Sequence, residues 1–358
     1  MSAPVRVLVI DDSALMRKLI PQILAKDPGI QVVGTAMDGE FGLKKIEELH
    51  PQVVTLDLEM PRMDGMETLR QIMRRFKIPV IVVSAHSTSG ASATFKALSL
   101  GAFDFVAKPR DAASAHMEDI SAQLIAKINA AASSHARLMA PAFEPARVLK
   151  PSGGRKNLPP TKVVVIGIST GGPNALQYLL AHLPPDFPGA IVAVQHMPEG
   201  FTDMFARRLN DSCSVEVKEA QSGDMLVAGR VLICPGNKHI RVKRMALGDV
   251  AVLNDEDRVN GHRPSVDVLF RSAAEQFGVH SIGVLMTGMG EDGAEGLGVM
   301  KDAGALTIAQ DEQSCVVFGM PKAAIEKGFA QRVVSLEMMA NTLVAQCAAE
   351  QHRIAAKA

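Results

Sequence analysis

The chain has 358 residues, a length that predicts two or three domains, each with its own core. Its 38 basic and 38 acidic residues cancel, so there is no net charge to hold a polyanion or an anionic membrane surface, and neither nucleic acid nor lipid is an expected partner. The four cysteines form no C-x-x-C pair, and we see neither a secretory signal nor a long apolar span. We therefore expect a soluble, cytoplasmic protein without membrane insertion, in which the cysteines are mostly packing residues.

Residues 4–128 repeat a strand-then-helix pattern five times. The runs that predict strands are Val5–Ile10, Gln31–Ala36, Val53–Leu58, Val80–Ser84 and Phe103–Ala107. An amphipathic stretch follows each run. Five such units indicate a parallel sheet covered by helices on both faces, with its site at the carboxyl ends of the strands.

Charged and hydroxyl side chains gather at those carboxyl ends. Asp11 and Asp12 end the first strand, and Asp57 lies near the end of the third. Ser84 ends the fourth strand, and Lys108 follows the fifth. Three converging carboxylates favour a hard cation such as Mg²⁺, and the lysine could pair with a phosphoryl group on one of them. The alternative is a structural acidic cluster that caps the strand ends.

This half of the chain resembles the receiver domain of two-component response regulators, a flavodoxin-like (βα)5 fold. The resemblance implies that Asp57 accepts a phosphoryl group from a histidine kinase. It assigns Mg²⁺ to Asp11, Asp12, Asp57 and the backbone of Glu59, and it assigns the phosphorylation switch to Ser84, Phe105 and Lys108. The family often has Thr at the Ser84 position and Tyr at the Phe105 position.

From about Ala130 the composition changes to prolines, alanines and a Ser-Gly-Gly stretch that break every periodicity. We therefore predict a linker over residues 129–160. It separates the receiver-like domain, residues 4–128, from a second domain over residues 161–351.

The second domain is again strand-helix in rhythm. Its predicted strands are Val163–Ile168, Ala190–Gln195, Val215–Glu219, Val231–Cys234, Ser281–Met286, Ala305–Ala309 and Arg332–Val334. Helices are predicted over 173–183, 200–209, 265–277, 292–303, 320–327 and 336–350. Because residues 221–262 look like hairpins, we predict a doubly wound α/β sheet that is mostly parallel with some antiparallel strands.

A serine lies at the corner between the first strand of this domain and the following helix. Gly167 and Gly171 flank Ser169 as G-x-S-x-G, and glycines there let the backbone turn sharply enough to hold a hydroxyl out of the sheet. This is a position for a nucleophile and its oxyanion. The alternatives are an ordinary strand-to-helix turn and a nucleotide-binding loop. However, the glycine of the dinucleotide fingerprint and the Gly-Lys-Ser/Thr of a P-loop are both missing.

The next strand ends in the motif Q-H-M-P, which contains His196. If sequential strands are neighbours, this histidine lies beside the Ser169 turn and can act as a general base. The alternative is a hydrogen-bonded structural histidine. His239 and His262 compete for the role of base, but each lies in a polar segment with no strand end behind it.

The strand Ser281–Met286 runs into a glycine-rich segment that contains Met289 and Asp292. Asp292 precedes a predicted helix, as an N-cap would. The sharper hypothesis is that Asp292 orients His196 and that backbone N–H groups near Met289 line an oxyanion pocket.

Three motifs carry a second resemblance: S-T-G-G-P at Ser169, Q-H-M-P at His196, and T-G-M-G-E-D-G from Thr287 to Gly293. Together they closely resemble the catalytic domain of the bacterial chemotaxis protein-glutamate methylesterases. The chain order Ser, His, Asp differs from that of the α/β-hydrolases. The resemblance implies a nucleophile, a base and an orienting acid at Ser169, His196 and Asp292, with the oxyanion stabilised by Thr170 and the backbone of Met289.

The implied reaction is hydrolysis of glutamate methyl esters, and deamidation of glutamines, on methyl-accepting chemoreceptors, regulated by phosphorylation and giving sensory adaptation in chemotaxis. The implied partners are these receptors and the chemotaxis histidine kinase. Mg²⁺ would serve receiver phosphorylation only, and ester hydrolysis would need no cofactor. The alternatives are a non-catalytic ligand-binding sheet and a transcriptional regulator, but we find no helix-turn-helix or basic recognition helix after residue 160.

Overall fold

The computed structural model describes residues 3–85, 88–108, 117–133 and 158–355. The chain divides into two compact units, Met1–Phe143 and Glu144–Ala358. Most of the predicted linker, from residue 134 to residue 157, lies outside the described residues. Its first part, residues 129–133, continues the helix α5 (Met117–Ser133).

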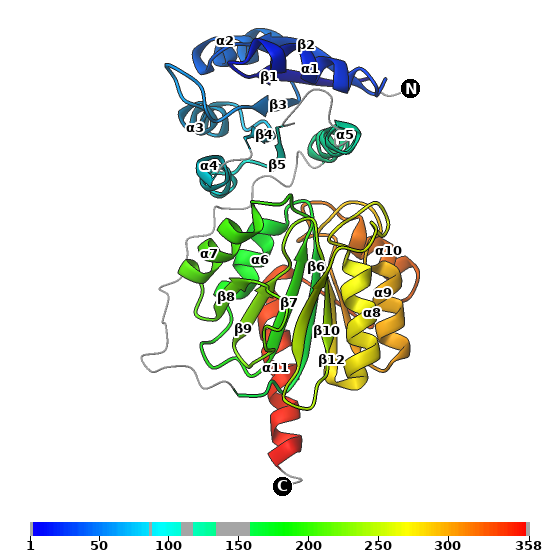
Figure 1. Ribbon diagram of the computed structural model, residues 1–358. Coiled ribbons are helices and arrows are strands. Elements are labelled where there is room, and N and C mark those ends of the chain that lie inside the picture. The colour runs from blue at the N-terminus through cyan, green and yellow to red at the C-terminus, as the bar shows by residue number, and fades with distance from the viewer. Residues whose placement is uncertain (1–2, 86–87, 109–116, 134–157, 356–358) are drawn as a thin grey trace. The chain divides into compact units, whose positions relative to one another are not determined.

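The first unit is a five-stranded parallel sheet in the order β2-β1-β3-β4-β5. Its strands are β1 (Val5–Ile10), β2 (Ile30–Ala36), β3 (Val53–Leu56), β4 (Val80–Ser84) and β5 (Asp104–Ala107). Its helices are α1 (Ala14–Leu24), α2 (Gly39–Leu49), α3 (Gly65–Arg75), α4 (Thr88–Ser99) and α5. Helices α1 and α5 pack together, and α3 packs with both α2 and α4 (Figure 1). The predicted (βα)5 fold is confirmed, although β3 ends at Leu56, so that Asp57 is the first residue beyond the strand.

The second unit has a seven-stranded parallel sheet in the order β14-β13-β12-β6-β7-β9-β8. Its strands are β6 (Val163–Ile168), β7 (Ala190–Gln195), β8 (Glu216–Glu219), β9 (Arg230–Ile233), β12 (Ser281–Leu285), β13 (Leu306–Gln310) and β14 (Arg332–Val334). Its helices are α6 (Gly172–Ala181), α7 (Thr202–Ser212), α8 (Val266–Phe277), α9 (Ala294–Asp302), α10 (Met320–Glu326) and α11 (Leu336–Ala355), with a short 3-10 helix η1 (Gly278–His280). Helices α8, α9 and α10 form one layer, and α6, α7 and α11 form the other (Figure 1). The predicted doubly wound sheet is confirmed.

The antiparallel strands do not join this sheet. Strands β10 (His239–Lys243) and β11 (Val250–Asn254) pair only with each other, in a separate two-stranded sheet. This hairpin packs on α8, where the Val242 amide donates to the Ser272 hydroxyl at 3.0 Å. The main sheet is therefore wholly parallel, with strands buried from both sides, as the apolar runs in β6 and β7 require.

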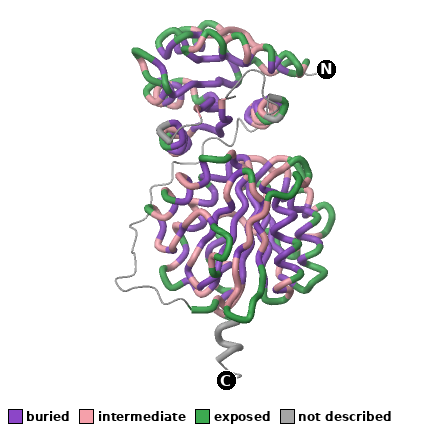
Figure 2. The backbone as a smooth tube through the Cα atoms, viewed as in Figure 1, coloured by how far each residue is buried: buried purple, intermediate pink, exposed green. Residues whose placement is uncertain are grey.

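The core of each unit lies along its central strands, which Figure 2 shows as buried. All four cysteines are buried and free, and burial raises the pKa of the Cys234 thiol well above its ordinary value and that of Cys347 to about 12. They are therefore packing residues, as expected. No described helix combines the length and the apolar character that crossing a membrane requires.

Candidate active site

Three neighbouring parallel strands, β7, β6 and β12, bring the predicted triad residues to one edge of the sheet. Ile168 pairs with Gln195 at the ends of β6 and β7, so Ser169 and His196 are the next residues along these two strands. On the other side of β6, the Ser169 amide donates to the Thr287 carbonyl at 3.0 Å, just beyond β12. The strand order reverses at β6, the position where ligands bind in open α/β sheets.

The turn that carries Ser169 depends on two glycines for different reasons. Gly171 has a φ of +74°, in the left-handed region that favours glycine, and it is the N-cap of α6. Gly167 lies within β6, where a Cβ would stand 2.2 Å from a methyl carbon of Val266. Its lack of a side chain therefore does not serve the turn, as the sequence predicted, but lets the N-terminus of α8 approach β6.

The side chains of His196 and Asp292 form a buried pair. His196 Nε2 lies 2.8 Å from Asp292 Oδ2, and the two side chains are only 10% and 1% exposed. Because a neutral imidazole donates at one nitrogen and accepts at the other, this bond assigns the proton to Nε2 and leaves Nδ1 as the basic atom.

The basic nitrogen of His196 is available to accept a proton. His196 Nδ1 is buried and has no hydrogen-bond partner among the described residues. His196 Nδ1 forms no hydrogen bond with Ser169, so only the register of β6 and β7 places these two residues next to each other. In enzymes without substrate, catalytic hydrogen bonds are often long and shorten only when substrate binds.

Asp292 caps a helix, but not the helix that the sequence predicted. Helix α9 begins at Ala294 and has Gly293 as its N-cap without a side-chain bond. Asp292 instead accepts the Val266 amide and the Ser265 hydroxyl, both at 2.7 Å, at the N-terminus of α8. Residues 265 and 266 are distant from Asp292 in sequence, which is why a local rule selects the wrong helix.

A second aspartate, in α8, caps helix α9 in turn. Asp267, in the first turn of α8, accepts the Gly296 amide of α9 at 2.6 Å. The Asn260 side chain donates to both carboxylates, at 2.7 Å to Asp267 and 3.1 Å to Asp292. Two helices therefore exchange caps, and this exchange fixes Asp292 before any substrate binds.

The charge on Asp292 is well stabilised. Burial opposes it, but hydrogen bonds from His196, the Val266 amide and the Ser265 hydroxyl outweigh burial and hold the pKa of Asp292 well below its usual value. Asp267 shows the opposite balance, because burial raises the pKa of its carboxyl and the nearby Asp292 adds to the rise. Asp292 is thus the carboxylate that stays ionised and can stabilise a protonated His196.

Two segments predicted to line the oxyanion pocket lie near the serine, because a Cβ on Gly288, the residue before Met289, would stand 2.8 Å from the Ser169 Cβ. Thr170 follows Ser169 and is buried, and Met289 lies in the loop after β12. Within the described chain, the backbone N–H groups of Thr170 and Met289 donate to no other group. Thr287 holds this loop, because its hydroxyl donates to the Thr170 carbonyl at 3.0 Å. N–H groups without another acceptor are available to an oxyanion.

The first unit has an acidic site at its own carboxyl edge. Oxygen atoms of Asp11, Asp12 and Asp57 lie within 4.8 Å of one another. Lys108 Nζ lies 2.6 Å from Asp57 and 3.2 Å from Asp11, and the Glu59 amide donates to Asp57 at 3.2 Å. Burial raises the pKa of the Asp11 and Asp57 carboxyls, although Lys108 opposes the rise. A hard cation fits this set of carboxylate oxygens.

The predicted switch residues border this site. The Ser84 hydroxyl donates to the Gly90 carbonyl at 3.1 Å, and Phe105 is buried edge-on to Phe95 with ring centroids 6.2 Å apart. The Lys127 ammonium lies 5.3 Å from the centre of the Phe105 ring. The aromatic residue is therefore packed inward in this structure.

Comparison with known proteins agrees with the fold of both units. The family model for CheB methylesterase matches residues 164–343, and the model for the response regulator receiver domain matches residues 7–117. The chain belongs to the CheB methylesterase family. It is 60% identical to protein-glutamate methylesterase/protein-glutamine glutaminase 2 of Koribacter versatilis over 98% of both chains. It is 43% identical to the protein of the same activities from Pyrococcus horikoshii, over 96% of this chain and 94% of that one.

A solved structure supports the assignment of the second unit. The crystal structure of the Thermotoga maritima CheB methylesterase catalytic domain is 42% identical, with a TM-score of 0.51, and it covers 52% of this chain and 98% of that chain. This CheB-family chain therefore combines a methylesterase domain with a receiver domain.

Sequence reasoning missed Gln195. Its side-chain amide donates to the carbonyls of Ser169 at 3.0 Å and His196 at 3.2 Å, while its Oε1 is buried without a hydrogen-bond partner. Gln195 thus links the serine turn to the histidine loop. The available signal was a polar residue at the end of a fully buried strand.

His239, the other candidate base, has a structural role. It is fully buried, accepts the Ser265 amide and contacts the Asp257 carbonyl at 3.0 Å.

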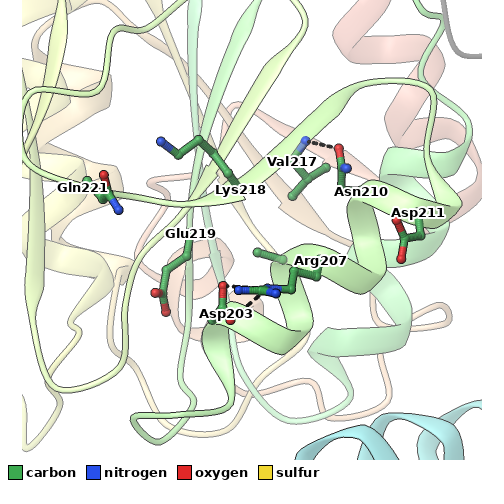
Figure 3. Close-up of a pocket in the computed structure, with 9 residues that line it drawn as sticks. Asp203, Arg207, Asn210, Asp211, Val217, Lys218, Glu219 and Gln221 are labelled. Atoms are coloured by element: carbon green, nitrogen blue, oxygen red, sulfur yellow. Dashed lines mark hydrogen bonds and ion pairs between the residues drawn. The ribbon is translucent and has the colours of Figure 1, made fainter. Parts of the chain in front are cut away.

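A surface groove of about 420 Å³ lies between α7 and β8, apart from the triad (Figure 3). It is lined by Asp203, Ala206, Arg207, Asn210, Asp211, Val217, Lys218, Glu219 and Gln221. Arg207 pairs with Asp203 inside the groove. None of the residues that line the groove belongs to the predicted triad.

Proposed function

We propose that Ser169, His196 and Asp292 are the catalytic triad of this protein-glutamate methylesterase and protein-glutamine glutaminase. The observation that carries the proposal is the buried bond between His196 Nε2 and Asp292, which leaves Nδ1 open at the strand end beside Ser169. The depressed pKa of Asp292 supports it, because an ionised carboxylate stabilises the imidazolium that forms during proton transfer.

The reaction follows from these positions. His196 Nδ1 takes the Ser169 proton while the serine oxygen bonds to the γ-carbonyl carbon of the substrate glutamate. The N–H groups of Thr170 and Met289 hold the oxyanion of the tetrahedral intermediate. The intermediate collapses, and methanol, or ammonia from a glutamine, leaves with the proton from His196. Water then attacks the acyl-enzyme by the same route and releases the glutamate carboxylate.

In the receiver unit we assign phosphoryl acceptance to Asp57. Asp11, Asp12, Asp57 and the backbone carbonyl of Glu59 would hold Mg²⁺, which would supply positive charge beside the phosphoryl oxygens. Lys108 already pairs with Asp57 and would pair with the phosphoryl group. Ser84 and Phe105 would carry the change to the surface of the domain.

The remaining assignments follow from the family. We place the receiver domain at 4–128, the linker at 129–160 and the catalytic domain at 161–351, with the first five linker residues still in α5. The phosphodonor would be the chemotaxis histidine kinase, and the substrates would be methyl-accepting chemoreceptors at their cytoplasmic helices. Such an enzyme acts in the cytoplasm, without nucleic acid and without membrane insertion, and it gives sensory adaptation in chemotaxis.

The test measures methanol released from methylated receptor membranes and ammonia released from receptor glutamines. Wild-type protein should release both. Ser169→Ala should release neither while it keeps a cooperative thermal transition, because a small side chain in a turn supports little packing. Ser212→Ala, at the end of α7, is the matched control and should behave as wild type. Ester hydrolysis by Ser169→Ala within a few-fold of wild type would refute the assignment.

A further inference from the structure

A second imidazole lies flat against the ring of His196. The rings of His262 and His196 have centroids 4.0 Å apart and planes within 5° of parallel. His262 is half-buried and comes from the segment between β11 and α8, not from one of the strand ends that carry the triad. The stack is therefore a contact to the base that neither the strand register nor Asp292 provides.

The base needs such a contact because of how it is hydrogen-bonded. Asp292 holds the His196 ring at Nε2, while Nδ1 is buried without a hydrogen-bond partner among the described residues. One hydrogen bond fixes one atom, and the ring can still tilt about that atom because the terminal torsion of histidine has broad minima. A flat neighbour at van der Waals distance restricts the tilt and fixes the direction of the Nδ1 lone pair.

A tight turn holds the second ring in place. Val259 and His262 exchange two backbone hydrogen bonds, of 2.9 and 3.1 Å, around Asn260 and Gly261. Both central residues have positive φ, 54° and 76°, as in the type I′ turn that an Asn-Gly pair favours. The Asn260 side chain also donates to Asp292. One turn thus holds the orienting carboxylate and the stacking ring together.

We infer that His262 is a positioning residue of the esterase, which keeps the His196 ring in the plane where Nδ1 can take the Ser169 proton. The inference rests on the proposed role of His196 as the base. His262 acts through the face of its ring, and no proton passes through it. A flat apolar ring should therefore serve at this position, whereas an apolar side chain without a flat face should not.

The test compares His262→Phe with His262→Leu for kcat and KM of methanol release, with thermal midpoints measured by circular dichroism. His262→Phe should keep kcat within about fivefold of wild type. His262→Leu should lower kcat about 10- to 100-fold at unchanged KM and similar thermal midpoint, as expected for a misplaced catalytic group. His182→Leu is the matched control, because the His182 ring also contacts an aromatic ring, that of Tyr178, with centroids 4.2 Å apart, but at the end of α6 away from Ser169. It should leave kcat unchanged.

Two results would overturn the inference. One is a wild-type kcat for His262→Leu, and the other is a kcat for His262→Phe as low as that of the leucine variant, which would mean that the ring nitrogens are required. If His262→Leu does not fold, His262→Met replaces it in the same comparison. Ser169→Ala and His196→Ala test the triad separately. If both are inactive while His262→Leu is fully active, only the positioning role fails, whereas wild-type rates in both would refute the triad itself.

Discussion

The substitution Asp292→Asn removes the charge of the orienting carboxylate and keeps its size. In the structure this carboxylate accepts bonds from His196, Val266, Ser265 and Asn260. Hydrogen bonds to a buried charge contribute about 1.5–3 kcal/mol each, so losing the charge should lower the free energy of unfolding by roughly 2–4 kcal/mol. Losing the partner of the imidazolium should lower kcat roughly 10³- to 10⁴-fold, which corresponds to about 4–5.5 kcal/mol in the barrier.

The pH dependence of stability tests the same charge. The pKa of Asp292 is lower in the folded chain than in the unfolded chain, where an aspartate titrates near about 4. Its stabilising effect is therefore fully present above about pH 4 and is lost as the pH falls through the folded-state pKa. The difference in the free energy of unfolding between wild type and Asp292→Asn should therefore be largest near pH 7 and should decrease below about pH 4.

Urea unfolding can be followed by the fluorescence of Tyr178, because the sequence has one tyrosine and no tryptophan. Asp267→Asn is the control with the opposite sign. Burial raises the pKa of Asp267, so wild type should gain stability over this variant as the pH falls. A kcat for Asp292→Asn within tenfold of wild type, or a stability difference that does not change with pH, would refute this reasoning.

Three further predictions concern other parts of the molecule. His196→Ala should lower kcat more than Asp292→Ala. Because a triad acts as a unit, the fold-loss of kcat in the double variant should be much smaller than the product of the two single fold-losses. A double variant whose loss equals that product would mean that one residue has only a structural role. Gln195→Met keeps the volume but removes the bonds to two carbonyls, so kcat should fall about tenfold at constant KM; a lower thermal midpoint with unchanged kcat would contradict this. A small phosphodonor with Mg²⁺ should raise methanol release about 5- to 150-fold in wild type, and EDTA or Asp57→Asn should abolish the rise; activation that persists in Asp57→Asn would place the acceptor elsewhere.

The two parallel sheets could be predicted from the sequence, whereas the predicted antiparallel strands lie outside the main sheet. Buried apolar runs such as Val163–Ile168 mark parallel strands, and polar residues directly after such runs lie at one edge of the sheet. This logic brought Ser169 and His196 together, and it placed Asp57 and Lys108 in the receiver domain. This reasoning works because the apolar pattern of a strand and the residue at which the strand ends can both be read from a short stretch of sequence.

The contacts that hold the site in place could not be predicted in this way. Asp292 caps α8 rather than α9, because Gly167 and Gly293 leave room for Val266 to approach. Such packing depends on residues that are distant in sequence. The stack of His262 on His196 depends on the Asn-Gly turn before it, a hairpin signal within the segment read as polar and without a strand end.

The most direct test of the triad is the acyl-enzyme itself. We would mix the protein with methylated receptor fragments, quench with acid within milliseconds to seconds, digest the mixture and search for the branched peptide by mass spectrometry. The account predicts an ester between the Ser169 oxygen and a receptor glutamate side chain, formed far more slowly in His196→Ala and absent in Ser169→Ala. An adduct on another side chain such as Thr170, or methanol release by Ser169→Ala, would contradict it.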